Sequence, residues 1–396
     1  MTLSEWQSQQ VTVSSGDNLN SVSPANCRII TERFERRMCL PYIVYMPERD
    51  RLLLLVSCDS PCRPMLMSSD DRGETWTDPC PMIPENAQGK SCLGIALTYM
   101  GNGRAAASVS VYPSSHACRS RIFSQDYGAT WSDPIPIPLT SAEQDLHPWD
   151  PWLVDIDPAS GSAIRIAETG YTHSNDVPYG GRSQAFIRFS DDGGMTWSDE
   201  IAPPTWDGVD EVFLCRAANG DIVASCRLNP PHEYWQEIDH YEGLGASRSR
   251  DNGHTWSDVN VLYPWGRHHA SIVLLPDGDI VMSHVVRKGY PDTSDGYPQF
   301  GIEAVISRDH GASWDMPHRY ILAQWRGNTR GEDPELERQF RAKWPRWWAS
   351  GQSTSTTLLP DATILTAFGT GYRSRPSASG ECSPKDVGLV KWRVGQ

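Results

Sequence analysis

The sequence contains no run of apolar residues that approaches the length of a membrane-spanning segment. Its first ten residues, MTLSEWQSQQ, lack the apolar stretch of a secretion signal. The ten cysteines include no C-x-x-C pair and have no regular spacing, which disfavours a disulfide framework. No low-complexity linker divides the chain. These absences predict a cytoplasmic protein with free thiols that does not insert into a membrane.

Basic residues are also scarce relative to acidic ones. The 35 lysines and arginines are outnumbered by 49 aspartates and glutamates, so the formal net charge is −14. Such a charge argues against nucleic acid or an anionic membrane as the partner. It does not exclude a small anionic substrate, because a pocket can be locally basic. We therefore expect a small-molecule or carbohydrate substrate, and the sequence does not indicate an oligomeric state.

What the sequence has is a motif that occurs five times, with the frame S-x-D-x-G-x-[ST]-W. The copies are SDDRGETW at 69–76, SQDYGATW at 124–131, SDDGGMTW at 190–197, SRDNGHTW at 249–256 and SRDHGASW at 307–314. Their tryptophans are 55, 66, 59 and 58 residues apart. Glycine supplies a positive φ, aspartate accepts backbone hydrogen bonds across the turn, and tryptophan packs below it. Because each copy follows a short apolar run, we interpret all five as structural hairpin turns without catalytic function.

A second repeat precedes the turns and predicts the architecture. Six segments have a strand, a turn rich in glycine, aspartate or asparagine, and a second apolar strand, as in AANGDIVASCR and LPDGDIVMSHV. Six units of about four strands predict an all-β, six-bladed β-propeller with antiparallel blades. The repeats fill the chain, so we expect one domain over residues 1–396. DVGLVKWRV near the C-terminus predicts the third strand of blade six, and QQVTVSS near the N-terminus predicts its outer strand, which would close the ring.

The repeated frame resembles the Asp-box, or BNR, repeat of the sialidase (neuraminidase) superfamily. This resemblance covers residues 30 to 396 and implies a pocket over the propeller axis. A sialidase binds the substrate carboxylate with three arginines and uses an aspartate as acid/base and a tyrosine nucleophile assisted by a glutamate. Glu211 and Arg227, sixteen residues apart, match the family's glutamate and one of its arginines. Asp59 takes the place of the acid/base aspartate, and Arg37 lies near that of the first arginine.

The sequence also departs from the family's pattern. The strand before the fifth motif, FGIEAVIS, contains no arginine, and Gln352 stands near the place of the tyrosine. We therefore interpret the chain as a divergent sialidase-like member that lacks the complete arginine triad and the tyrosine nucleophile.

Blade geometry predicts which further residues line the pocket, because the starts of first strands and the ends of second strands lie around the axis. Asp150, between two tryptophans in HPWDPW, is the most site-like carboxylate, since apolar surroundings raise the pKa toward that of a general acid. The candidate catalytic residues are Glu211, Asp150 and Asp59. The candidate substrate-binding residues are Arg37, Arg227, Arg287, His147, His268, His269, Gln352, Trp149, Trp347 and Tyr372. Glu168 and His284 are further pocket candidates.

Several of these residues have alternative interpretations. For Glu211 and Arg227 the alternative is structural: the two residues form an ion pair that links two strands and has no further function. At most one of His268 and His269 is expected to face the pocket, because neighbouring strand residues point to opposite faces. A zinc site formed by His268 with His147, His284 and Asp150 matches no known spacing of ligands, so no metal or cofactor is predicted.

The sequence is consistent with three classes of function. The first is a sialidase-like exo-glycoside hydrolase acting on an acidic or unusual sugar, since paired carboxylates suit acid/base cleavage of a glycoside. The alternative is a non-hydrolytic lyase, isomerase or cyclase on a rewritten sialidase scaffold. The third is a carbohydrate-binding propeller, which the many titratable residues on the predicted axis disfavour.

Overall fold

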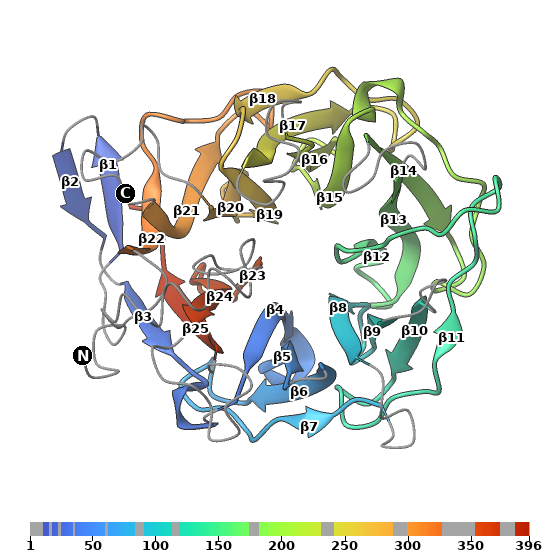
Figure 1. Ribbon diagram of the computed structural model, residues 1–396, viewed down its shortest axis with the longest axis horizontal. Coiled ribbons are helices and arrows are strands. Elements are labelled where there is room, and N and C mark those ends of the chain that lie inside the picture. The colour runs from blue at the N-terminus through green and yellow to red at the C-terminus, as the bar shows by residue number, and fades with distance from the viewer. Residues whose placement is uncertain are drawn as a thin grey trace.

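The computed structural model describes residues 11–15, 18–22, 25–34, 36–59, 62–83, 91–112, 119–173, 182–230, 241–287, 299–326, 353–372 and 385–395. Six antiparallel sheets surround a central axis in sequence order, which confirms the predicted six-bladed β-propeller (Figure 1). Within these residues, no helix is both long and apolar enough to cross a membrane.

Each blade begins with its innermost strand and proceeds outward. Blade one contains β4 (Met38–Met46), β5 (Arg51–Cys58), β6 (Arg63–Ser69) and β7 (Cys80–Pro81), and blade two contains β8 (Ser91–Tyr99), β9 (Ala105–Tyr112), β10 (Arg119–Ser124) and β11 (Ile135–Pro136). Blade three contains β12 (Leu153–Ile156), β13 (Ala163–His173) and β14 (Ser183–Ser190), and blade four contains β15 (Val209–Arg216), β16 (Ile222–Leu228), β17 (Gly243–Ser249) and β18 (Asn260–Tyr263). Blade five contains β19 (Arg267–Leu274), β20 (Ile280–Val286), β21 (Gln299–Ser307) and β22 (Tyr320–Arg326), and blade six contains β23 (Thr354–Leu358), β24 (Ile364–Tyr372), β25 (Lys385–Trp392) and β3 (Asn26–Ile29). Short 3-10 turns are formed by η2 (Glu32–Phe34), η3 (Pro47–Arg49) and η5 (Pro204–Trp206).

Blade three departs from the expected four strands. In place of a fourth strand, β14 has two isolated antiparallel bridges on its outer edge, Gln184 with Asp207 and Ile187 with Ile201. The two backbone hydrogen bonds between Ile187 and Ile201 measure 2.9 and 2.8 Å. The outer edge of this blade is therefore paired at separate points rather than along a continuous strand.

An N-terminal strand closes blade six, but it is not the strand expected from the sequence. The outer strand is β3, which pairs with β25 in antiparallel register. The segment expected there contributes β1 (Thr12–Ser15), which pairs instead with β22 of blade five and continues into β2 (Asn18–Ser21). The expectation was wrong because alternating valines in QQVTVSS fit any free sheet edge, and β22 offers one to the same stretch of chain.

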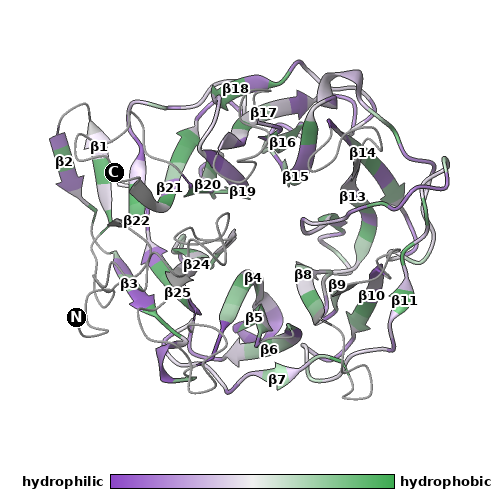
Figure 2. Ribbon diagram, viewed as in Figure 1, coloured by the Kyte–Doolittle hydropathy of each residue, from purple (hydrophilic) through white to green (hydrophobic). Residues whose placement is uncertain are grey.

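The alternation of apolar side chains along the strands forms the contacts between blades. Figure 2 shows hydrophobic and hydrophilic segments alternating around the ring, with hydrophobic segments on β4 and β21, for example. Separate apolar clusters lie at the blade junctions: Leu53 and Leu55 of blade one pack with Ile95 and Leu97 of blade two. The hydrophobic core of this protein is thus a ring of inter-blade layers, which leaves the axis to polar residues.

The five repeated motifs form the turns that the sequence predicts. In each, the aspartate accepts hydrogen bonds from the backbone N–H and the hydroxyl of the serine or threonine four residues later, as Asp309 does from Ser313 at 2.8 and 2.6 Å. These bonds to Thr75 lower the pKa of Asp71 to about 2, because they favour its charged form.

The motif glycines have a second function that the sequence did not reveal. Gly311 of blade five has φ +82°, and a Cβ at this position would lie 2.6 Å from the side chain of Val223 in blade four. Gly128 of blade two approaches Leu53 of blade one in the same way, at 2.7 Å. These turns therefore also pack against the preceding blade.

This packing can be separated from backbone strain by comparing two glycines. Gly311→Ala and Gly220→Ala both place a side chain at positive φ, which costs about 1–2 kcal/mol. At Gly220 no atom lies within 4 Å of the added Cβ, whereas Gly311→Ala also collides with Val223, so we expect a further loss of about 1–3 kcal/mol. Urea unfolding of both variants measures the difference. Equal losses would contradict the packing function of the motif glycine.

Candidate functional site

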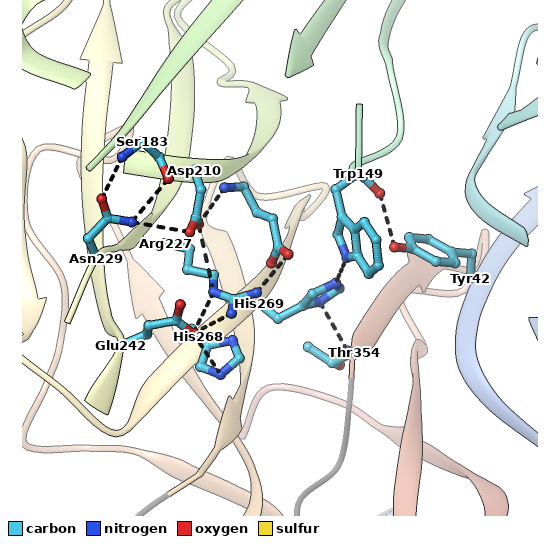
Figure 3. Close-up of polar contacts among 11 residues, drawn as sticks. Tyr42, Trp149, Ser183, Asp210, Arg227, Asn229, Glu242, His268, His269 and Thr354 are labelled. Carbon is cyan, nitrogen blue, oxygen red and sulfur yellow. Dashed lines mark hydrogen bonds and ion pairs between the residues drawn. The ribbon is translucent and has the colours of Figure 1, made fainter. Parts of the chain in front are cut away.

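Three side chains link blades one, three and five across the propeller axis (Figure 3). The Tyr42 hydroxyl, on β4, donates to the backbone carbonyl of Trp149 at 3.0 Å. The indole Nε1–H of Trp149 donates to Nε2 of His269, on β19, at 2.8 Å. We call Tyr42, Trp149 and His269 the axial bridge. It places the neighbouring Asp150 close to the axis.

The sequence around Trp149 explains how an irregular segment can be held there. Proline occupies positions 148 and 151, and proline restricts the preceding residue to extended backbone. The segment is anchored on one side by the antiparallel bridge of His147 with Tyr171, and on the other by the backbone N–H of Trp152, which donates to Thr98 Oγ1 at 3.0 Å. A stiff segment with two anchors presents Asp150 in one position.

Four buried carboxylates and one arginine form the centre of the site. Arg227, on β16, donates from Nη1 to Glu211 Oε1 at 2.6 Å and from Nε to Glu242 Oε2 at 2.9 Å. Its Nε also lies 3.7 Å from Asp210 Oδ1. Asp150, Asp210, Glu211 and Glu242 are each at most 6% exposed. We call these four residues with Arg227 the carboxylate cluster.

The electrostatics of this cluster act most strongly on Asp150. Burial raises the pKa of Asp150 well above its usual value, and the nearby charges of Glu211 and Asp210 raise it further. Arg227 and a hydrogen bond from the backbone of Val212 oppose this increase. The result is a carboxyl group that stays protonated under conditions in which an exposed aspartate is ionised.

A β-bulge places two consecutive carboxylates on the same arginine. Side chains of neighbouring strand residues normally point to opposite faces. The pairing of β15 with β16 shifts register between Val209 and Val212, so Asp210 and Glu211 both approach Arg227. This irregularity cannot be read from the sequence pattern.

A second bulge changes the expectation for the two histidines. The register of β19 shifts between His268 and Ser271, and His269 has φ +50°. His269 joins the axial bridge, while His268 Nε2 lies 3.9 Å from Glu242 Oε2. The expectation that only one of them faces the pocket was wrong, because it assumed a regular strand.

Three buried or half-buried cations gather on the blades opposite the carboxylates. Lys385 begins β25 of blade six, Arg287 follows β20 of blade five, and Arg37 precedes β4 of blade one. Burial lowers the pKa of Lys385 to about 7. Cys39 opposes this shift, and the positive charges of Arg37 and Arg287 lower the pKa further. We call these three residues the cation cluster.

His269 lies between the two clusters. Burial lowers its pKa to about 4, and it experiences the charges of Glu211, Arg227 and Arg287. The imidazole is therefore neutral near pH 7, with Nε2 accepting the hydrogen bond from Trp149. The site is divided into a carboxylate side on blades three and four and a cation side on blades five, six and one.

The remaining predicted residues lie at other places. Asp59 is bound by Arg36 at 2.8 and 2.6 Å and has a side chain 34% exposed. The His147 ring stacks on Tyr171 with centroids 5.1 Å apart. Tyr372 ends β24, where its backbone pairs with Lys385. Gln352 and Trp347 lie outside the described residues.

Glu168, a pocket candidate from the sequence, instead belongs to a buried ion network. It accepts hydrogen bonds from Arg121 of blade two, Arg188 of blade three and the Trp152 indole, at 2.5 to 2.9 Å. The two positive charges lower the pKa of Glu168 despite the opposing effect of burial. This network links two blades.

The zinc site considered from the sequence is not assembled. Within the described residues, no three histidine, cysteine, aspartate or glutamate side chains are grouped to hold a metal ion. His147 lies against Tyr171, and His284 lies 3.6 Å from Glu303, so the two histidines have different partners.

Sequence reasoning missed Lys385, Glu242 and Tyr42. The available signal for Lys385 was its position at the start of KDVGLVKW, the third strand of blade six. The starts of third strands lie at the same end of a blade as the starts of first strands and the ends of second strands, and only these two groups of positions were considered. Glu242 follows the same rule, because it directly precedes β17.

Comparison with known proteins agrees with this architecture. Residues 88–320, more than half of the chain, match the family described as BNR repeat-like domain. No curated protein sequence matches the chain.

Solved structures similar to this protein include both uncharacterised and enzymatic chains. A protein of unknown function from Dyadobacter fermentans has 14% identity and a TM-score of 0.66, over 93% of this chain and 98% of that chain. The Hadza microbial sialidase Hz136 has 14% identity and a TM-score of 0.60, over 90% of this chain and 66% of that chain. The NanB sialidase of Streptococcus pneumoniae has 13% identity and a TM-score of 0.58, over 90% and 68%. This chain thus spans about two thirds of each sialidase chain, and at these identities the similarity concerns the fold.

The ion network around Glu168 provides a test of which carboxylates are structural. Glu168→Ala leaves Arg121 and Arg188 buried without their counter-charge, so we expect the free energy of unfolding to fall by about 3–5 kcal/mol. Asp155→Asn is the control, because it breaks the half-exposed ion pair with Arg216 and should cost about 0–1 kcal/mol. Urea unfolding at neutral pH measures both. Similar losses in the two variants would contradict the structural function of the buried network.

Proposed function

The chain belongs to the BNR repeat-like domain family and has a sialidase-like propeller fold, and from this premise we propose that it is an exo-acting glycoside hydrolase for an acidic sugar. The observation that supports this proposal most is the pairing of Asp150 and Glu211 in one buried cluster on the axis. One carboxyl group is kept protonated by its surroundings, and the other is bound to an arginine. A glycosidase needs such a division between two carboxyl groups.

Asp150 is the proton donor in this mechanism. Its raised pKa keeps the O–H bond intact near neutral pH, so the group can protonate the glycosidic oxygen as the bond to the anomeric carbon breaks. The axial bridge fixes its backbone through Trp149, whose carbonyl and indole both make hydrogen bonds. Proton transfer then occurs from a preorganised position rather than from a flexible loop.

Glu211 is the second carboxyl group. Oε1 accepts the hydrogen bond from Arg227, whereas Oε2 is buried and has no hydrogen-bond partner among the described residues. The free oxygen either attacks the anomeric carbon or removes a proton from the attacking water, and the product stereochemistry distinguishes these routes. Arg227 orients Glu211 and, with its guanidinium bound to two carboxylates, limits the rotation of that side chain.

The cation cluster supports an anionic substrate. Arg37, Arg287 and Lys385 lie near one another on blades one, five and six, across the axis from the carboxylate cluster. Guanidinium and ammonium groups bind carboxylate, sulfate or phosphate through charge-assisted hydrogen bonds. A sugar with its acidic group on this side has its glycosidic bond directed toward Asp150 and Glu211.

Lys385 favours the alternative of a non-hydrolytic lyase, isomerase or cyclase. Because its pKa is lowered to about 7, the neutral amine is populated near neutral pH and can act as a base. A base on the cation side removes a proton next to the acidic group of the substrate, which starts an elimination. Analysis of the products decides between the two, since hydrolysis adds water to the sugar and elimination leaves an unsaturated product.

The hydrolase proposal is tested by substitution of the two carboxyl groups. Asp150→Asn and Glu211→Gln should each reduce turnover of an acidic aryl glycoside about a hundredfold or more, because each removes a proton-handling group. Release of the aryl alcohol from a panel of acidic and neutral glycosides measures the activity, and Asp155→Asn is the control away from the cluster. Unchanged turnover per folded molecule in both variants would remove this pair from the mechanism.

The raised pKa of Asp150 also predicts opposite effects on activity and stability. Below pH 3.8 the carboxyl is protonated in the folded and the unfolded chain alike. Above that value the unfolded chain ionises first, so stability falls as the pH rises toward the folded pKa. Asp150→Asn removes this loss, and we expect its melting temperature at pH 7 to exceed that of the wild type, with a smaller difference at pH 4. A lower melting temperature at pH 7 would contradict a protonated Asp150.

A further inference from the structure

The joint at which the ring closes lies beside the cation cluster. In blade six, β3 from the N-terminal part of the chain pairs with β25 from the C-terminal part, and the backbone N–H of Ile30 donates to the carbonyl of Val387 at 3.0 Å. Figure 1 shows these strands, blue and red, side by side. After this joint the chain passes through η2 to Arg37 and into blade one. The cation cluster therefore includes residues from both sides of the joint.

Thr31 connects the two sides through its hydroxyl group. Oγ1 donates to Asp386 Oδ1 at 3.0 Å and accepts from the backbone N–H of Val387 at 2.8 Å. Asp386 is bound on its other side, where its backbone N–H donates to Thr370 Oγ1 at 3.1 Å. Thr31 is 1% exposed and Asp386 is 0% exposed. A hydrogen bond between two buried side chains has a strict geometry, because water cannot replace either partner.

The position of Asp386 determines the position of Lys385. The two residues are consecutive in β25, so their side chains point to opposite faces of the strand. One face carries Asp386, which accepts the hydrogen bond from Thr31. On the other face, Val387 follows Lys385 and shares an apolar cluster with Met38, the residue after Arg37. The positive charges of Arg37 and Arg287 act on Lys385 there. Thr31 also precedes Arg37 by only six residues, with η2 between them. A shift of Thr31 against Asp386 therefore changes the separation of Lys385 and Arg37.

We propose that Thr31 is a positioning residue for the cation cluster, so that an anion bound there links the N-terminal and C-terminal sides of the ring joint. This inference rests on the proposed function in one respect: it assumes that the cation cluster binds the acidic group of the substrate. It adds that ring closure and anion binding depend on the same contacts. An anion held by Arg37 on one side and Lys385 on the other opposes opening of the joint, and a correctly closed joint preorganises the anion site.

A purely structural function of Thr31 makes a different prediction. If the hydroxyl only stabilises blade six, then its loss lowers the melting temperature and leaves the affinity of the folded protein for anions unchanged. Thr366 provides a matched control for this case. It is also a buried threonine of blade six, 0% exposed, whose hydroxyl accepts from the indole N–H of Trp392 and from Thr356 Oγ1 in the strand β24.

The experiment measures the dissociation constant of inorganic phosphate by calorimetry at constant ionic strength, set with sodium chloride. For Thr31→Val we expect the dissociation constant to rise about tenfold relative to the wild type, because the cations lose their fixed spacing. Thr31→Ser keeps the hydroxyl and should restore wild-type affinity. Thr366→Val should lower the melting temperature without changing phosphate affinity. Equal affinity in Thr31→Val and the wild type would overturn the positioning function while leaving the proposed hydrolase unaffected.

A second measurement requires only the wild-type protein. Phosphate should slow hydrogen exchange of the backbone N–H groups of Ile30 and Val387, which donate across the joint to the Val387 carbonyl and to Thr31 Oγ1. The exchange of the Ile201 N–H in blade three should be unchanged. The absence of selective slowing in a protein that binds phosphate would overturn the coupling. If the wild type does not bind phosphate, the anion site itself is overturned, and with it the acidic-sugar part of the proposed function. Failure of the coupling and failure of the anion site are therefore distinguishable.

Discussion

The closure of the ring by β3 and β25 is the constraint on which the rest of this structure depends. Each blade buries its apolar faces only against its two neighbours, so a chain of blades with open ends would expose two such faces. Pairing the N-terminal strand with the last blade removes both ends at once and brings residues from opposite ends of the chain within hydrogen-bonding distance. Six inner strands then approach one another around the axis. Their polar residues are held there at fixed distances from one another.

Within this ring, the axis carries two opposite charge distributions. The carboxylate cluster occupies blades three and four, and the cation cluster lies across it on blades five, six and one. Neutral His269 experiences charges from both clusters, those of Glu211 and Arg227 on one side and that of Arg287 on the other. Because the surroundings are buried, these charges act strongly on one another, and they help to shift the pKa values of Asp150 and Lys385. A substrate with one acidic group therefore encounters a site that already defines its orientation.

Such a site is costly for the folded state. Burying Asp150 beside two other carboxylates, and Lys385 beside two arginines, destabilises the charged forms of both groups. The protein compensates at other positions, with the five aspartate turns, the Arg121–Glu168–Arg188 network and the apolar layers between blades. This separation of stabilising and destabilising contacts is expected when electrostatics are arranged for a reaction rather than for stability.

The sequence by itself determined the repeat and hence the fold. A turn with glycine at positive φ and an aspartate acceptor depends on contacts within eight residues, so five copies could be recognised without any tertiary structure. Glu211, Arg227 and Asp150 could be selected in the same way, because their places in the blade repeat bring them to the axis. The sequence did not determine which strand closes blade six, since both QQVTVSS and the later Asn26–Ile29 can pair with an open edge.

Only the tertiary structure decided how the selected residues combine. The bulges in β15 and β19 reverse the expected direction of a side chain, and no pattern in the sequence marks them. Glu168 was separated from the pocket by two arginines from different blades, and Lys385 was brought into it by the ring closure. These contacts join residues far apart in the chain, so their existence depends on the relative positions of whole blades. The local sequence encodes the blades, and the closed ring determines which charges meet on the axis.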